Sequence, residues 1–351
     1  MKNSRRLGAV VIALASILWL ASVLVAADSL PASLSDDEFW RLIEEFSEPN
    51  GTFRSENLLS NELQFQRVLP SLASAARPGR AYLGVGPEQN FTYIAALKPA
   101  VAFIVDIRRA NLDLHLLYKA LFEIAADRAE FVSRLFSRPR PSGLGAATSA
   151  QDLFEAFEGE SPNERLYLET LAAIRNQLYT RHRFEIPEED LRGIEYVFRA
   201  YFMLGPAIRY SPIGLTGGTV QPTYAQLMAA SDDQGRARAF LATEDLFRVV
   251  KDLEGRNLIV PIVGNFAGGK TLRAVGSYLK QKGTPVSAFY LSNVEEYLRP
   301  VGNWQAFCAN AAALPHDAAS LFIRSYRSPT GDPSDGLITV AGPFAAIASC
   351  Q

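Results

Sequence analysis

Hydrophobic positions follow two patterns along the chain, and together they predict an alternation of strands and helices. Short apolar runs that end at glycine, asparagine or aspartate predict buried strands, and longer stretches with apolar residues every three or four positions predict helices between them. A mostly parallel, doubly wound α/β sheet of about six or seven strands follows from this order. The expected strands are 81–86, 101–105, 258–263, 285–291, 320–326 and 337–340.

The rhythm of these elements divides the chain into five segments. Residues 28–80 predict an N-terminal helical segment, and residues 81–126 the first half of a Rossmann-like domain. Residues 127–256 are mostly helical in pattern and predict an insertion, in which a seventh strand could form. The strand pattern resumes in residues 257–351, the second half of the domain. Residues 1–27 stand apart from all of these.

The N-terminus has the pattern of an export signal. Lys2, Arg5 and Arg6 precede residues 7–27, a run of 21 residues without a charge that ends in small side chains. The run is also long enough to span a bilayer, so residues 1–27 are either a cleaved signal peptide or an uncleaved membrane anchor. Both alternatives predict an exported chain, periplasmic or anchored to the inner membrane by residues 7–27. A buried core helix is the weakest alternative, because the run has no polar face.

Charge and cysteine content exclude several classes of protein. Lys and Arg total 35 against 37 Asp and Glu, a net charge of −2, so we expect no nucleic-acid partner. The two cysteines, Cys308 and Cys350, form no CxxC pair, and the three histidines are scattered, so we expect no metal site. In an oxidising compartment the cysteines could pair; two buried free thiols are the alternative.

A glycine turn followed by an acidic strand end marks the candidate binding site. Gly84 and Gly86 lie where the first expected strand meets a helix, whose N-terminus offers free N–H groups. Asp106 ends the next strand, 20 residues after Gly86, a spacing that suits hydrogen bonds to ribose hydroxyls. The third glycine of GxGxxG is replaced by Gln89. The pattern therefore favours a nucleoside over a dinucleotide, although the arginines that follow Asp106 could instead pair with its carboxylate.

The run YLGVGPEQNFTYIAALKPAVAFIVDIRRANL, with the later strand LIVPIVGN and the closing strands, resembles class I S-adenosylmethionine-dependent methyltransferases. It resembles more closely an uncharacterised family of bacterial methyltransferase-like proteins. The similarity covers roughly residues 81–126 and 257–345. It implies that Gly84 and Gly86 line the methionine part of the cofactor and that Asp106 binds its ribose. Residues after a later strand, Gly264 and Asn265, would face the methyl acceptor.

The chain departs from the pattern of these methyltransferases at the glycine turn. Tyr82 stands where they usually have an acid, and Pro87 follows the second glycine. Glu88 is the residue that could substitute for the missing acid electrostatically. No catalytic residue is assigned. The set expected to bind S-adenosylmethionine or a related nucleoside is Gly84, Gly86, Glu88, Asn90, Asp106, Gly264, Asn265 and Phe266.

Residues 264–271 also match the phosphate-loop pattern GxxxxGK[ST], between an expected strand and an expected helix. In a true phosphate loop, Lys270 would reach the β and γ oxygens of a nucleotide and Thr271 would hold Mg²⁺. The context argues against it, because the next strand runs into Ser292 and Asn293 and supplies no magnesium-binding aspartate. The alternative is a glycine-rich turn at the carboxyl edge of the sheet.

Three hypotheses for function follow, and each predicts a different arrangement. A methyltransferase-like domain predicts an open small-molecule pocket between Gly84, Asp106 and Asn265, at the carboxyl edge of the sheet. A non-catalytic envelope binding module predicts that side chains such as Tyr82 or Phe266 fill the pocket. A phosphate-loop nucleotide-binding protein predicts an anion site centred on Lys270. If residues 7–27 stay uncleaved, the membrane is a further partner.

Overall fold

The computed structural model describes residues 29–210, 221–327 and 336–350. At its centre lies a six-stranded, mostly parallel sheet with the strand order β3-β2-β1-β4-β5-β6. The predicted α/β class is confirmed, and the arrangement is consistent with a Rossmann-like fold. The strands are β1 (Ala81–Gly84), β2 (Val101–Asp106), β3 (Ile259–Val263), β4 (Val286–Tyr290), β5 (Leu321–Arg327) and β6 (Leu337–Pro343).

Burial is complete along β1, β2, β3 and β4 and only partial along β5 and β6. Every residue of the inner strands β1, β2 and β4 is buried, as expected for parallel strands that are covered on both faces. β3 lies at one edge and contains Pro261, which an edge strand tolerates because it needs fewer backbone donors. β6 closes the other edge and runs antiparallel to β5. The strand order changes direction next to β1. The chain runs outward from β1 to β2 and β3, and then crosses back so that β4 pairs with the other side of β1.

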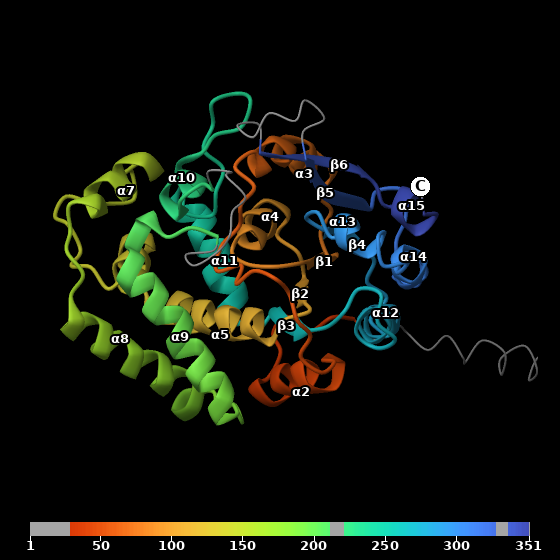
Figure 1. The fold of residues 1–351 in the computed structure, drawn as a ribbon, viewed down its shortest axis with the longest axis horizontal. Helices are drawn as coiled ribbons and strands as arrows, with labels where there is room; N and C mark the ends of the chain where they lie inside the picture. The colour runs from red at the N-terminus through yellow and green to blue at the C-terminus, as the bar shows by residue number, and fades with distance from the viewer. Residues whose placement is uncertain (1–28, 211–220, 328–335, 351) are drawn as a thin grey trace, which may run out of the picture.

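Helices cover both faces of the sheet (Figure 1). One group contains α3 (Leu69–Ala75), α4 (Gln89–Leu97), α5 (Arg109–Ile124) and α11 (Glu244–Gly255), which pack against one another. The other group contains α2 (Asp36–Phe46), α12 (Thr271–Gln281), α14 (Trp304–Ala312) and α15 (Phe344–Ala348). The short helix α13 (Glu295–Leu298) follows β4. The helices expected between the strands are therefore present, and they form two layers, one on each face of the sheet.

The insertion is helical, as predicted, and lies outside α5 (Figure 1). In its described part it contributes no strand to the sheet, so the seventh strand is not found there. Its α-helices are α6 (Arg128–Phe136), α7 (Ala150–Glu158), α8 (Glu164–Arg175), α9 (Glu188–Leu204), α10 (Tyr224–Ala229) and α11, the last of which packs against α4 and α5 and so belongs to the layer on the sheet. The shorter helical turns of the chain are η1 (Phe65–Val68), η2 (Asn176–Arg181) and η3 (Gly205–Ala207).

The N-terminal helix α2 is fixed to the domain by its apolar face and by a buried histidine. His182 lies with Nδ1 2.7 Å from Asp36 and Nε2 2.7 Å from Glu123 of α5. Burial lowers the pKa of His182, but the hydrogen bonds and charges of the two carboxylates outweigh it and raise the pKa overall. The ring therefore links Asp36 of α2 to Glu123 of α5 through both of its nitrogens.

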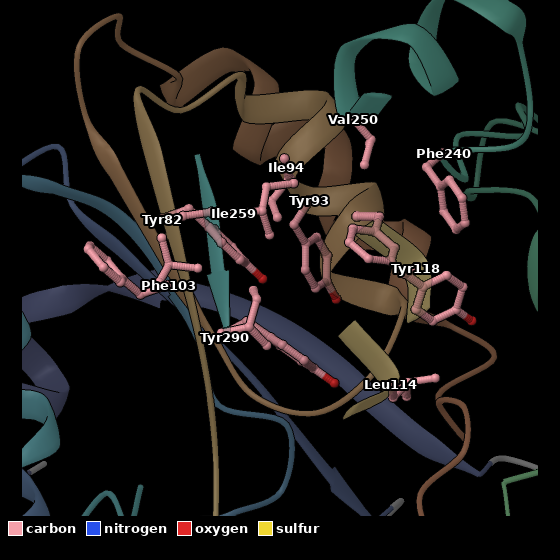
Figure 2. Packing of buried hydrophobic residues seen from close by; sticks show 14 of the residues in the cluster. Tyr82, Tyr93, Ile94, Phe103, Leu114, Tyr118, Phe240, Val250, Ile259 and Tyr290 are labelled. Carbon is pink, nitrogen blue, oxygen red and sulfur yellow. The ribbon is translucent and has the colours of Figure 1, made fainter. Parts of the chain in front are cut away.

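Aromatic side chains fill much of the core (Figure 2). The ring centroids of Tyr93 on α4 and Tyr290 on β4 are 5.1 Å apart, and Tyr82 of β1 lies beside them. All three are almost completely buried. Burial raises the pKa of each hydroxyl well above its usual value, so these tyrosines stay neutral and act as hydrogen-bonding groups.

Of the two alternatives for the cysteines, the structure has the disulfide. Cys308 of α14 is bonded to Cys350, which follows α15, with the two Cα atoms 5.5 Å apart. The bond ties the end of the chain to the helix layer of α12 and α14. Within the described ranges, no helix is both long and apolar enough to cross a bilayer. The expected signal or anchor, residues 1–27, lies outside the described residues.

Candidate functional site

A pocket of about 150 Å³ opens at the carboxyl ends of the central strands. Residues 85–87 after β1, 105–107 at the end of β2, 264–266 after β3 and 292–294 after β4 all contribute to its wall. This is the point at which the order of the sheet reverses between β1 and β4. Open α/β sheets bind ligands in the crevice at such a point.

Five of the eight residues expected at the binding site line this pocket. They are Gly86, Asp106, Gly264, Asn265 and Phe266. The other three lie behind the glycine turn and support it from the core. They are Gly84, Glu88 and Asn90, and Tyr82 is likewise not among the lining residues. The pocket is therefore open at Gly86, and Tyr82 does not fill it.

Asn90 holds the glycine turn from behind. Its side-chain amide donates to three successive backbone carbonyls, those of Val85 at 3.0 Å, Gly86 at 3.1 Å and Pro87 at 2.7 Å. Its Oδ1 accepts from the Tyr82 hydroxyl at 2.8 Å. Because carbonyl and N–H groups point in opposite directions across a trans peptide, carbonyls that face Asn90 turn the N–H of Gly86 the other way.

Gly84 and Gly86 meet different structural requirements for a glycine. A Cβ on Gly84 would collide with the side chains of Asn90 and Tyr82, so this residue makes room for the support of the turn. Gly86 has φ +76° and open space around its Cα, so its conformation requires glycine while its surface faces the pocket. The carbonyl of Gly86 also accepts from Nε2 of His115 at 2.9 Å. Burial lowers the pKa of His115 to about 4, so this ring is a neutral donor.

Glu88 does not provide the negative charge that would replace the acid missing at position 82. Its carboxyl is fully buried and accepts from the backbone N–H of Ser60 at 3.2 Å. Burial raises its pKa to about 8, and the bond from Ser60 opposes this only in part. At neutral pH the group is mostly protonated and joins residue 60 to the glycine turn as a neutral hydrogen-bonding group.

Asp106 lies at the pocket and is paired with Arg108, one of the two arginines that the sequence offered as partners. Its Oδ1 accepts from the backbone N–H of Arg108 at 2.9 Å, and Oδ2 lies 3.3 Å from the guanidinium. Arg108 also donates to the carbonyl of Glu56. Both side chains of the pair are buried. The carboxylate is thus held in place and neutralised, and Oδ2 keeps acceptor capacity for a ligand hydroxyl.

A second carboxylate, Glu62, lines the pocket and was not among the expected residues. Its Oε1 accepts from the hydroxyls of Tyr290 at 2.8 Å and Ser292 at 2.5 Å. Its Oε2 accepts from Gln89 at 2.9 Å, from Ser325 at 2.6 Å and from Thr339 at 3.2 Å. The side chain is 1% exposed. No local pattern marks Glu62, because its partners come from four other elements of the chain.

The loop that matches the phosphate-loop pattern holds a carboxylate of its own chain. Glu48, just after α2, accepts from the backbone N–H of Asn265 at 3.0 Å, Lys270 at 2.9 Å and Thr271 at 3.1 Å. A Cβ on Gly268 would collide with the same carboxylate. Lys270 Nζ is bonded to the carbonyl of residue 47 at 2.6 Å. The groups that would cradle a phosphate therefore bind Glu48.

The wall of the pocket is acidic and aromatic. The described lining residues include two carboxylates, those of Glu62 and Asp106, and no lysine, arginine or histidine. In the same part of the chain, no group of three or more histidine, cysteine, aspartate or glutamate residues is placed to hold a metal ion. The aromatic residues of the wall are Phe53, Tyr210, Phe266, Tyr290 and Tyr297.

Comparison with known proteins identifies the family of this chain, but the description of that family names no activity. A family model described as a domain of unknown function (DUF7790) matches residues 58–335. No curated protein matches the chain. The matched range begins in the irregular segment before η1 that carries Glu62, and it includes all four strand ends of the pocket.

Proposed function

Because the chain belongs to the DUF7790 family, whose description names no activity, we propose a function from the pocket itself: the domain binds a small molecule of the nucleoside type at the carboxyl edge of its sheet. The observation that carries this proposal is the position of the Asp106 carboxylate on the pocket wall. Asp106 ends β2 and is held by Arg108 with acceptor capacity remaining. A carboxylate at this position suits a pair of ribose hydroxyls.

S-Adenosylmethionine, the cofactor that the methyltransferase resemblance implies, fits this pocket in charge and only partly in size. A wall that includes the carboxylate of Glu62 and, among its described lining residues, no basic side chain suits the sulfonium and amino groups of this molecule better than the phosphates of a nucleotide. A volume of about 150 Å³ is below the roughly 300–1,000 Å³ typical of ligand pockets. The pocket therefore holds part of such a molecule, and we derive no methyl-transfer step.

The first prediction concerns Asp106. Replacement by asparagine is expected to weaken the binding of adenosine or S-adenosylmethionine by about tenfold or more, because a hydrogen bond to a charged acceptor contributes roughly 1.5–3 kcal/mol. Calorimetric titration of residues 28–351 measures the affinity, with ATP–Mg²⁺ as the anionic comparison. Asp233→Asn is the matched control, since Asp233 is 70% exposed and outside the pocket wall. Equal affinities in the unaltered chain and Asp106→Asn would contradict the proposed site.

A second candidate function is a non-catalytic binding module of the cell envelope on the same fold. Two observations favour it: Tyr82 in place of the acid, with its hydroxyl committed to Asn90, and the disulfide between the only two cysteines. Disulfides persist mainly outside the cytoplasm. The pocket filled by Tyr82 that the sequence led us to expect for such a module is not found, since Tyr82 is not among the lining residues and the pocket is open at Gly86.

The second prediction tests the export that both candidates assume. In the full chain produced in a bacterium and isolated without reductant, Cys308 and Cys350 are expected to resist alkylation until a reductant is added. A chain without residues 1–27 should remain in the cytoplasm and carry two reactive thiols, because thiols are kept reduced there. The mass added by alkylation measures both. Free thiols in the full chain would remove the support that the disulfide gives to export.

A further inference from the structure

Glu62 leaves the pocket with one negative charge that no side chain of the described residues neutralises. The other carboxylate of the wall, Asp106, is cancelled by Arg108. No ion pair among the described residues includes Glu62, and the pocket wall offers it no basic side chain. Its five partners are uncharged donors, which satisfy the oxygen lone pairs and leave the formal charge in place.

The charge is held rigidly and away from water. Gln89 of α4, Tyr290 of β4 and Ser325 of β5 fix the two oxygens from different directions. After burial, the charge of Glu62 is the next cause that raises the pKa of Tyr290. Electrostatic attraction is stronger in such a site than in water. A buried charge without a counter-ion is costly, so a cationic ligand would be stabilised here.

The aromatic part of the wall suits the same kind of ligand. Rings attract cations through their negative faces, and aromatic walls recognise quaternary ammonium groups in this way. The rings of Phe53 and Tyr297 lie 4.9 Å apart at their centroids. The guanidinium of the exposed Arg54 lies 5.3 Å from the Tyr297 ring, outside the pocket wall. The Tyr297 ring is therefore already in contact with a cationic side chain of the same chain.

We propose that the pocket selects a small organic cation, an ammonium or sulfonium group, and that Glu62 is the residue that determines this specificity. The proposal rests on the proposed function, since it names the chemical class of ligand for the same pocket. The cation can be a molecule by itself or the charged part of a nucleoside. A pocket of about 150 Å³ is compatible with a group of this size.

The experiment compares choline with its neutral isostere, in which carbon replaces the nitrogen, by titration into the full chain. The two probes have the same shape and differ in charge. We expect choline to bind about tenfold more tightly than the isostere, or better. In Glu62→Gln this ratio should fall to near one. Glu155→Gln, on the exposed surface of α7, is the matched control and should keep the ratio of the unaltered chain.

The outcomes separate this inference from the proposed function. Equal affinity for both probes in the unaltered chain, or no binding of choline, overturns the inference even if Glu62→Gln fails to fold. An unchanged ratio in a folded Glu62→Gln also overturns it. Adenosine binding that depends on Asp106 would leave the proposed function standing in each case. The fourth outcome is that neither adenosine nor S-adenosylmethionine binds, while choline is still preferred in a way that depends on Glu62. It would overturn the proposal of a nucleoside ligand and support the inference of a cationic ligand.

Discussion

Replacing Asn90 with alanine is expected to lower the free energy of unfolding by about 4 kcal/mol and to abolish ligand binding at the pocket. The change removes three hydrogen bonds to the carbonyls of Val85, Gly86 and Pro87, and it leaves the Tyr82 hydroxyl without its acceptor. Buried polar groups that lose their partner cost roughly 1–3 kcal/mol each. Urea unfolding measures the stability, and titration with adenosine measures the binding.

Tyr82→Phe is the matched control for this prediction. It removes only the hydroxyl that donates to Asn90 and keeps all three bonds to the glycine turn. We expect a loss of about 1 kcal/mol in stability and no loss of binding. If Asn90→Ala and Tyr82→Phe had the same effect, the amide would not be the support of the turn.

Replacing Glu48 with alanine is expected to lower the free energy of unfolding by about 3 kcal/mol. The carboxylate binds three backbone N–H groups of the loop after β3, and hydrogen bonds to a charged acceptor are about twice as strong as neutral ones. The variant also loosens the attachment of α2, whose following residues bond to the end of β3. Chemical denaturation with the same protein preparation measures the difference.

Glu45→Gln is the control for Glu48, because Glu45 is an exposed residue of α2 whose ion pair within the described part of the chain is the exposed one with Arg41. An exposed pair of this kind contributes less than about 0.5 kcal/mol. The unaltered chain is expected to give no ATP–Mg²⁺ binding at this loop, since its N–H groups are occupied by Glu48. Binding of ATP–Mg²⁺ that Lys270→Ala removes would contradict this account and restore the phosphate-loop hypothesis.

The fold could be predicted from the sequence because its signals are local. Uninterrupted apolar runs such as 101–105 occur where parallel strands are covered on both faces, and the helical period between them is equally local. The glycine turn is local as well, since φ +76° at Gly86 demands glycine. Asp106 and residues 264–266 could be placed at one edge because the carboxyl ends of parallel strands meet there.

By itself, then, the sequence determined the α/β sheet, the helical insertion and the edge at which the pocket opens. Only the tertiary structure decided which polar groups meet. Glu62 and Ser325 are 263 residues apart and still share a hydrogen bond, and Glu48 lies 217 residues before the N–H of Asn265 that it binds. No period or motif encodes such contacts, because they depend on how separate elements pack. The occupied phosphate loop and the charge of the pocket follow from that packing.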